Sequence, residues 1–464
     1  YGVKSETLSQ AQSSLFEEDW QSDVSAIEAE IEQLPLSSPQ KPKRARAGRQ
    51  PLPDHLPRIE HRHEPQSCQC KQCGSDWVKI GEDVSEQLDV EPAKFFVHRH
   101  IRPQYACRSC ETVTVEPVSP AVIDSGMAAP GLLAWITTCK YLDHLPLYRI
   151  AQIATRQEVT LSFSTLAEWV GRVGVALQPL ADRLIWHLLQ GRVLHADETP
   201  VAQLDPGSGK TQRAYLWAYR SNDFELGPRI IVFDYQTSRS GKHAQSFLAG
   251  WQGSLVVDDY AGYKPLFTLG NCTELGCWAH ARRKFFDLHQ ANASAVAFEA
   301  LQRIGELYAV EAEGKELSAE ARQQLRAEKS IPILQSLHHW LLQTRFHTAD
   351  GGGTAKAIDY TLKRWQSLIR YAGSGFLPID NNPVENTIRP IAIGKKNWLF
   401  TGSERAGKRA AAIQTLLGAA KLNGINPAQW LADTLEKLPA WPNSRIDELL
   451  PLSPDFIELL KQKI

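Results

Sequence analysis

The chain has 464 residues, of which 43% are hydrophobic and 22% are charged, and its formal net charge is −1. This length is too great for one ordinary hydrophobic core, so we expect a protein of two to four domains. The near-zero net charge excludes a uniformly basic protein that coats nucleic acid, so contacts with phosphates must come from local patches. The sequence contains no run of about 18 apolar residues and no signal-peptide pattern, which favours a cytoplasmic protein without a membrane partner.

Residues 1–50 are expected to form an N-terminal helix and a basic linker. Val24, Ile27, Ile31 and Leu34 have the spacing of an amphipathic helix, which either docks on its own chain or is a coiled-coil remnant. Residues 35–49 are rich in proline, serine and basic residues and contain no acidic residue. This composition predicts a flexible linker that contacts DNA phosphates through Lys43, Arg44 and Arg46, although a merely solvated linker has the same composition.

Residues 51–120 contain two Cys-x-x-Cys pairs separated by a strand-like stretch. The pairs are Cys70 with Cys73 and Cys107 with Cys110. Four thiolates in this arrangement suit one structural Zn²⁺, so a zinc ribbon is predicted. A disulfide framework fits poorly with a chain that lacks secretion signals, whereas Cys68 leaves an alternative ligand open.

Residues 121–190 have a helical pattern with a polar break in the middle. The segment 147–156 is followed by a second helical segment at 164–172, with Ser162 or Ser164 as a possible N-cap. A helix-turn-helix would place Ser164, Thr165 and Arg172 near a DNA groove, but an ordinary packed helical hairpin gives the same pattern.

Residues 191–285 are expected to form the first part of an α/β core. The predicted order is three strands, a helix and two strands: 192–197, 214–220, 229–235, the helix near 243–250, then 254–258 and 274–279. This order is that of the ribonuclease-H-like fold, in which the first strand lies beside the fourth. The charged helical stretches of 286–372 are interpreted as a helical insertion, and 373–464 as the second part of the core with C-terminal helices.

Three carboxylates are placed at the ends of separate predicted elements: Asp197, Asp258 and Glu385. Pro383 can occupy the first turn of a helix and place Glu385 just inside it. Ligand sets made only of oxygen suit Mg²⁺ or Mn²⁺, and two such ions are the usual device for phosphoryl displacement. Acids at strand ends are also common as helix caps, so the local pattern alone leaves that alternative open.

Five motifs carry a resemblance to a known family. They begin at His195, Asp258, Cys277, Asp380 and Gly394, and they read His-Ala-Asp-Glu-Thr-Pro, Asp-Asp-Tyr-Ala-Gly-Tyr, Cys-Trp-Ala-His-Ala-Arg-Arg-Lys-Phe, Asp-Asn-Asn-Pro-Val-Glu and Gly-Lys-Lys-Asn-Trp-Leu-Phe-Thr-Gly. The chain resembles bacterial transposases of the insertion sequence sixty-six family from about residue 50 to Pro451. The resemblance implies a DDE transposase with a zinc-finger module on the four cysteines named above, and the family usually has Arg where this chain has Asn386.

The resemblance also selects among neighbouring residues. Successive strand residues face opposite ways, so only one of Asp197 and Glu198, and one of Asp258 and Asp259, can face the metals, and the family match selects Asp197 and Asp258. The pair Cys277-x-x-His280 could bind metal, but it also resembles a Cys/Asp-x-x-His signature of transposases that would place His280 in the active site. Cations next to these elements suit DNA phosphates: Arg282, Arg283, Arg389, Lys395 and Lys396. Trp398 either stacks on a freed base or is a core aromatic in a strand.

The resulting hypothesis is a metal-dependent polynucleotidyl transferase that nicks the ends of its own element and joins the 3′-hydroxyl to target DNA. It uses two Mg²⁺ or Mn²⁺ ions and one structural Zn²⁺. Its partners are the terminal inverted repeats, target DNA, a second copy of the chain or more on DNA, and possible accessory proteins at the bacterial nucleoid. The alternatives are a nuclease or resolvase on the same fold, or a domesticated DNA-binding protein without catalysis.

Overall fold

The computed structural model describes residues 94–464 apart from 107–112, 116–118, 125, 206, 269, 271 and 462–464. The predicted N-terminal helix and basic linker therefore lie outside the described residues. The description concerns the compact unit Val97–Ile464. Within the described part of the chain, no helix is long and apolar enough to cross a membrane.

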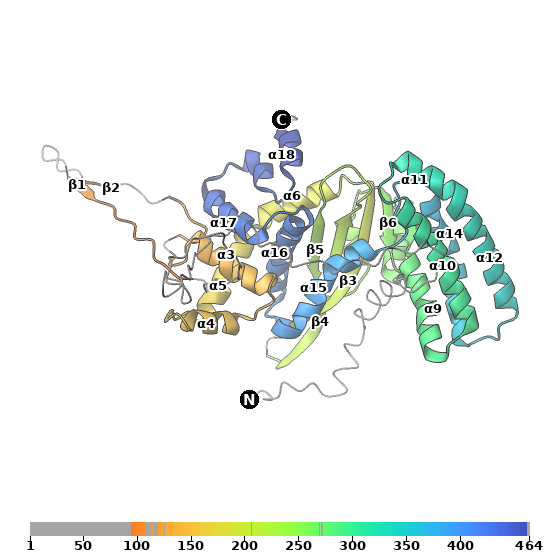
Figure 1. The fold of residues 1–464 in the computed structure, drawn as a ribbon. Helices are drawn as coiled ribbons and strands as arrows, with labels where there is room; N and C mark the ends of the chain where they lie inside the picture. The colour runs from red at the N-terminus through yellow and green to blue at the C-terminus, as the bar shows by residue number, and fades with distance from the viewer. Residues whose placement is uncertain are drawn as a thin grey trace, which may run out of the picture. The chain divides into compact units, whose positions relative to one another are not determined.

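A mixed sheet forms the centre of this unit (Figure 1). Its order is β5-β4-β3-β6-β7, and β8 adds to β3. The antiparallel part contains β3 (Val193–Asp205), β4 (Lys210–Ser221) and β5 (Ile231–Gln236), and the parallel part joins β3 to β6 (Gly253–Val257) and β7 (Cys272–Gly276). The short strand β8 is Phe400–Thr401. The expectation that the first core strand lies beside the fourth is confirmed.

The prediction that the first core strand ends at Asp197 is wrong, because β3 continues to Asp205. β4 pairs with β3 along this whole length, from Leu194↔Ser221 to Asp205↔Lys210, and this long hairpin keeps the polar second half extended. β6 pairs only with residues 193–195 of β3. Asp197 therefore lies inside a strand, just past the end of the parallel pairing. The predicted strand at 274–279 also ends early, because a helix begins at Trp278.

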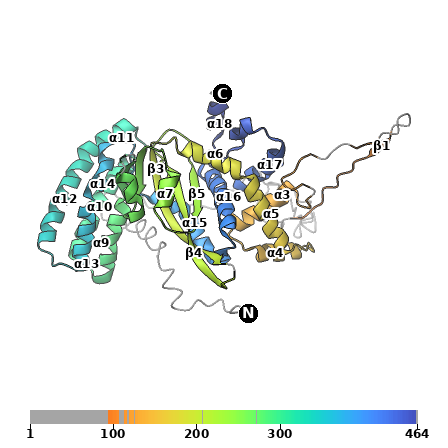
Figure 2. The same ribbon diagram turned by 180° about the vertical axis from the view of Figure 1, so that it is seen from behind.

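The two faces of the sheet are covered differently. α15 (Asn382–Trp398) and α16 (Glu404–Leu422) cover one face, where Val384, Ile388 and Ile391 pack on apolar side chains of β3, β4 and β5. The other face carries α7 (Lys242–Phe247) and the short helix η1 (Ala261–Tyr263), followed by α8 (Lys264–Thr268) (Figure 2). On this second face Phe247 stacks on Tyr219 with ring centroids 3.9 Å apart.

The helical region before the sheet packs around α16. It contains α3 (Pro130–Tyr141), α4 (Leu147–Thr155), α5 (Phe163–Ala176) and α6 (Gln178–Leu188). A Cβ on Gly174 of α5 would lie 2.7 Å from the Cβ of Arg409, so the lack of a side chain there permits the close approach of α5 and α16. The C-terminal elements are α17 (Pro427–Lys437), η4 (Leu438–Ala440), η5 (Asn443–Leu449) and α18 (Pro454–Lys461). Arg183 of α6 binds Asp447 of η5 at 2.5 Å.

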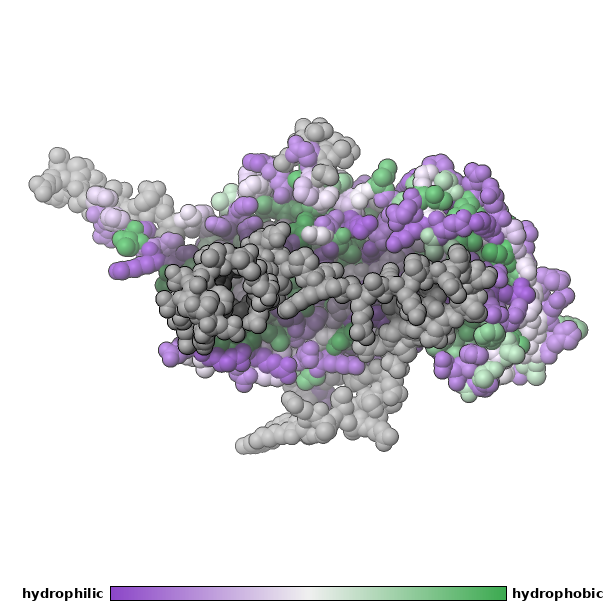
Figure 3. Space-filling model, viewed as in Figure 1, coloured by the Kyte–Doolittle hydropathy of each residue, from purple (hydrophilic) through white to green (hydrophobic). Residues whose placement is uncertain are grey.

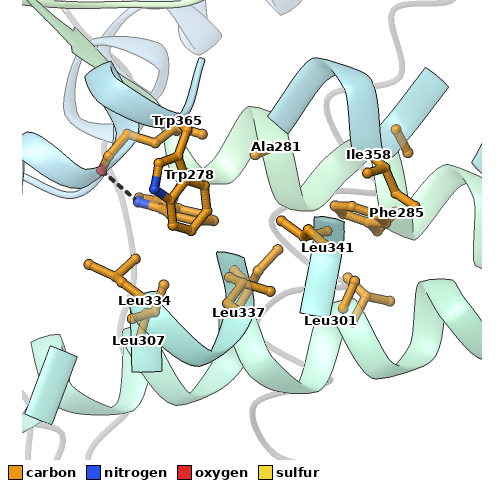
Figure 4. Close-up of a cluster of buried hydrophobic side chains, with 14 of the residues drawn as sticks. Trp278, Ala281, Phe285, Leu301, Leu307, Leu334, Leu337, Leu341, Ile358 and Trp365 are labelled. Atoms are coloured by element: carbon orange, nitrogen blue, oxygen red, sulfur yellow. Dashed lines mark hydrogen bonds between the residues drawn. The ribbon is translucent and has the colours of Figure 1, made fainter. Parts of the chain in front are cut away.

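A helical array separates β7 from α15. It contains α9 (Trp278–Asn292), α10 (Ala295–Glu313), α11 (Ala319–Leu325), the π turn η2 (Arg326–Ser330), α12 (Ile331–Phe346), α13 (Gly353–Lys363), α14 (Trp365–Ile369) and η3 (Arg370–Gly373). The array has its own core, in which Phe285 lies beside Ile358 and Leu341, and Leu334 and Leu337 lie below Trp278 (Figure 4). The Nε1 of Trp278 donates to the Leu368 carbonyl at 2.8 Å. Hydrophilic and hydrophobic side chains are interspersed on its outer surface, as expected for a surface that faces solvent (Figure 3).

Candidate active site

The three predicted carboxylates come from β3, the end of β6 and the first turn of α15. Asp197 projects from β3 toward the face covered by α15, since it pairs with Ala218, which packs in the core under that helix. Its Oδ1 accepts from the Glu198 N–H at 2.8 Å, and the Oδ1 of Asp258 accepts from the Tyr260 N–H at 2.9 Å. Pro383 lies at the start of α15 with Glu385 in the first turn, as predicted.

Electrostatic coupling indicates that these carboxylates lie close together. Burial raises the pKa of Asp197 well above its usual value, and the charges of Glu385, Glu198 and Asp258 raise it further. Like charges that repel one another in a partly buried site destabilise the ionised form, unless a cation offsets the repulsion. The cluster is therefore suited to hold a divalent ion.

The neighbours Glu198 and Asp259 bind protein cations. Glu198 projects toward the α7 face, where its Oε2 accepts from the Tyr263 hydroxyl at 2.8 Å and its Oε1 lies 2.6 Å from Arg239 Nη2. Burial and the charge of Asp258 raise the pKa of Glu198 to about 7, and Arg239 opposes this shift. Asp259 accepts from Arg364 Nη1 at 2.7 Å. These contacts direct Glu198 and Asp259 toward protein cations and away from the metal-binding role predicted for Asp197 and Asp258.

Asn381, the N-cap residue of α15, connects the start of this helix to the sheet. It is 1% exposed, and its side chain does not cap the helix. Instead its Nδ2 donates to the Ala196 carbonyl at 2.9 Å, and its Oδ1 accepts from His195 Nδ1 at 3.0 Å. Sequence reasoning assigned Asn381 no role of its own, although it lies inside the motif 380–385. The sequence signal for a special helix start was the run of polar residues at 380–382 directly before Pro383.

Asp380 joins the helical array to the same helix start. Its Oδ2 accepts from the Tyr308 hydroxyl of α10 and from Asn382 Nδ2, both at 3.0 Å, and its Oδ1 accepts from the Asn382 N–H at 3.1 Å. Burial raises the pKa of Asp380 to about 6, although its hydrogen bonds oppose this shift. Asp380 and Asn381 together position the first turn of α15, and with it Glu385.

His280, in the first turn of α9, lies beside Glu385. The Nδ1 of His280 is 3.5 Å from Glu385 Oε1. Burial lowers the pKa of His280, and the charges of Arg283, Lys284 and Arg364 lower it further, whereas the charge of Asp258 opposes this shift. Cys277 precedes α9 and is buried, and its Sγ accepts from the Asn381 N–H at 3.2 Å. Burial and the charges of Glu385 and Asp380 raise the pKa of the Cys277 thiol well above its usual value.

The predicted DNA-contacting residues of the core differ in their surroundings. Arg282 and Arg283 on α9 and Arg389 on α15 are half-buried, and Lys396 is exposed. Lys395 Nζ donates to the Pro200 carbonyl at 2.9 Å, so this amine holds α15 on β3. Trp398 is the last residue of α15 and packs on the core formed by β3, β4 and β5. Its side chain is half-buried, and it lies in a helix, whereas the core-aromatic alternative placed it in a strand.

The second helix of the predicted helix-turn-helix is α5. Ser162 is its N-cap and accepts from the Thr165 N–H at 3.1 Å. Ser164 and Arg172 are exposed and Thr165 is half-buried, while Arg172 lies 3.5 Å from Glu168 one turn away. The opposite side of α5 packs on α16. A row of polar side chains is thus available on the outer side of α5.

The remaining predicted site residues, which are the zinc ligands and the DNA-contacting residues of the linker, lie outside the described residues. These are Cys70, Cys73, Cys107 and Cys110, together with Lys43, Arg44 and Arg46. The strands β1 (Gln104–Ala106) and β2 (Val113–Val115) pair antiparallel on either side of the segment that contains Cys107 and Cys110. This pairing places Ala106 and Val113, the described residues that flank the segment, opposite one another.

Comparisons with known proteins identify the class of protein. A family model described as "Transposase IS66 family" matches residues 125–409, which is more than half of the chain. Models for the zinc-finger binding domain of transposase IS66, the IS66 C-terminal element and "Transposase C of IS166 homeodomain" match residues 67–111, 415–452 and 1–60. The zinc-finger match includes the four predicted cysteine ligands.

Full-length relatives support the same assignment. The uncharacterized protein y4qI of Sinorhizobium fredii is 40% identical over 98% of this chain and 87% of its own length. The uncharacterized protein y4jD of the same organism is 38% identical over 86% of this chain and 81% of its own length. The family models thus define a transposase with a zinc-finger domain. The chain belongs to the IS66 transposase family.

Proposed function

We propose that this protein is a DDE transposase that cleaves the ends of its own insertion sequence and joins the freed 3′-hydroxyl to target DNA. The observation that carries the proposal is the proximity of Glu385 and Asp258 to Asp197, whose pKa is raised first by burial and then by the charges of Glu385, Glu198 and Asp258. The order β5-β4-β3-β6-β7, with its antiparallel and parallel parts, supports a ribonuclease-H-like core.

The donor set of the site fits Mg²⁺ or Mn²⁺. Three carboxylates offer hard oxygen ligands, and their mutual repulsion is relieved by a divalent cation. Asp197, Asp258 and Glu385 would hold two such ions. When bound, the ions would activate the attacking hydroxyl and stabilise the leaving 3′-oxygen.

The rest of the site orients these ligands and the DNA. Asn381 and Asp380 fix the first turn of α15. This turn directs Glu385 toward the carboxylates of Asp197 and Asp258. His280, 3.5 Å from Glu385, can hold a proton next to that carboxylate or orient it. Arg282 and Arg283 on α9 and Arg389 on α15 would bind phosphates on either side of the scissile bond.

The N-terminal domains are proposed to select the DNA. One structural Zn²⁺ would be held by Cys70, Cys73, Cys107 and Cys110, in keeping with the zinc-finger match. The exposed polar side of α5, with Ser164, Thr165 and Arg172, and the linker residues Lys43, Arg44 and Arg46 would contact the terminal repeats. Two or more copies of the chain, with accessory proteins of the element, would hold both ends together at the bacterial nucleoid.

The test of this proposal is metal-dependent cleavage of DNA that carries the element ends. Asp197→Asn and Glu385→Gln should abolish cleavage in Mg²⁺ while end binding persists, because each removes a charge that holds the ions. The matched control is Asp259→Asn, since Asp259 adjoins Asp258 but binds Arg364. It should retain cleavage and lower the thermal stability. Wild-type cleavage by Asp197→Asn, or loss of cleavage in Asp259→Asn with the fold intact, would contradict the assignment.

A further inference from the structure

A second set of metal-binding atoms converges beside the carboxylate cluster. Cys277, His280 and Glu385 each offer one ligand atom, and these atoms lie within 4.8 Å of one another. They come from the turn after β7, the first turn of α9 and the first turn of α15. Two segments that are distant in sequence, residues 277–280 and the first turn of α15, thus present sulfur, nitrogen and oxygen to one point.

The chemistry of this set differs from that of the three carboxylates. A thiolate, an imidazole and a carboxylate form the mixed ligand set that Zn²⁺ and similar ions prefer, whereas Mg²⁺ selects oxygen alone. Three protein ligands also leave a fourth tetrahedral position for water or another oxygen. We propose that Cys277, His280 and Glu385 form a zinc-selective site that shares Glu385 with the carboxylate cluster.

The surrounding fold supports the orientation that such a site needs. Cys277 is 1% exposed, and its Sγ accepts from the Asn381 N–H, which directs the sulfur toward the start of α15. The Nδ1 of His280 is already 3.5 Å from Glu385 Oε1, close to the separation of two ligands on one tetrahedral ion. A small adjustment of the Cys277 side chain would complete the set. The thiol would lose its proton to solvent when the metal binds.

The shared ligand has a consequence that depends on the function proposed above. Glu385 engaged with Cys277 and His280 cannot take its full part in holding Mg²⁺ with Asp197 and Asp258. Zinc at this site and productive Mg²⁺ binding are therefore mutually exclusive, and free Zn²⁺ would inhibit DNA cleavage. The zinc site itself does not depend on the transposase mechanism, so the two claims can be tested separately.

The direct experiment counts zinc in the full-length protein. After equilibration with buffered Zn²⁺ and gel filtration, the wild type should contain one zinc per chain more than Cys277→Ser, in addition to the zinc of the finger. Serine keeps an acceptor for the Asn381 N–H, so circular dichroism should show the fold intact. Cys272→Ser is the matched control, because Cys272 is a buried free cysteine on β7, in the same part of the fold. It should retain the wild-type count.

A second readout reports the ligand itself. Co²⁺ added to protein whose finger already holds zinc should produce thiolate-to-cobalt absorption in the wild type and in Cys272→Ser, but not in Cys277→Ser. Equal zinc counts and equal cobalt spectra in wild type and Cys277→Ser would overturn the site. If the metal difference is found but Mg²⁺ supports no cleavage at any zinc concentration, the zinc site stands and the proposed function fails. If cleavage occurs but the metal difference is absent, the proposed function stands and the site fails.

Discussion

Replacing Asn381 by alanine should destabilise the fold and displace Glu385. The substitution removes the donor to the Ala196 carbonyl and the acceptor for His195 Nδ1, and both groups are buried. Leaving a buried polar group without a partner costs about 1 to 3 kcal/mol, so two such losses lower the free energy of unfolding by about 2 to 6 kcal/mol. The entropy of unfolding is about 2.1 cal/mol/K per residue, so in a unit of this size the thermal midpoint should fall by at least about 2.5 °C.

Catalysis should suffer more than stability in the same variant. Asn381 sets the position of the first turn of α15, and a misplacement of about 1 Å in a catalytic group can cost about 100-fold in rate. The assays are differential scanning calorimetry and Mg²⁺-dependent cleavage, measured below the new midpoint. The control is Asn386→Ala on the same helix, whose side chain is exposed and which should change stability by less than about 0.5 kcal/mol. Equal midpoints and equal rates for the two variants would refute the positioning role.

Further predictions separate structural from functional groups. Lys395→Ala should lower the thermal midpoint because it removes the bond to the Pro200 carbonyl, whereas Lys396→Ala should leave the midpoint unchanged and reduce the salt slope of DNA binding by about 1. Folding raises the pKa of Asp380 from 3.8 to about 6, so the folded state binds more protons between these pH values. The stability that this group contributes is complete below pH 3.8 and is lost as pH rises through about 6, so the thermal midpoint of the wild type should fall over this range. In Asp380→Asn this fall should be smaller, as measured by thermal melts. Cys107→Ser should reduce the zinc content by one per chain in metal analysis, since binding and folding of such a module are coupled.

Local patterns predicted the elements of the sheet but misplaced one important boundary. The apolar run that ends near Asp197 indicated a strand, and the following polar residues indicated its end. The strand continues because β4 pairs with it as far as Asp205, and such a partner cannot be recognised from the β3 sequence. Trp398 was misplaced for a related reason. Pro390 and Gly394 disfavour a helix, yet α15 runs through both, since Ile388 and Ile391 are anchored on the sheet.

The candidate carboxylates were identifiable from sequence, but their supporting residues were not. Asp197, Asp258 and Glu385 lie in distinctive motifs, and the resemblance to the family selects each Asp over its acidic neighbour. The role of Asn381 depends on contacts with Ala196 and His195, which are more than 180 positions away. The contact of Asp380 with Tyr308 likewise crosses from α10 to α15. Such long-range hydrogen bonds leave no periodic or local sequence signal.

We propose that this site transfers DNA strands and does not merely hydrolyse them. The most direct measurement supplies purified protein with pre-cleaved element ends, a supercoiled plasmid and Mg²⁺, adds accessory proteins of the element if required, and counts covalently joined products. We predict joined products in the wild type and none in Asp258→Asn. Steady hydrolysis of the ends without any joined product, even with the accessory proteins present, would contradict the transposase mechanism and favour a nuclease on the same fold.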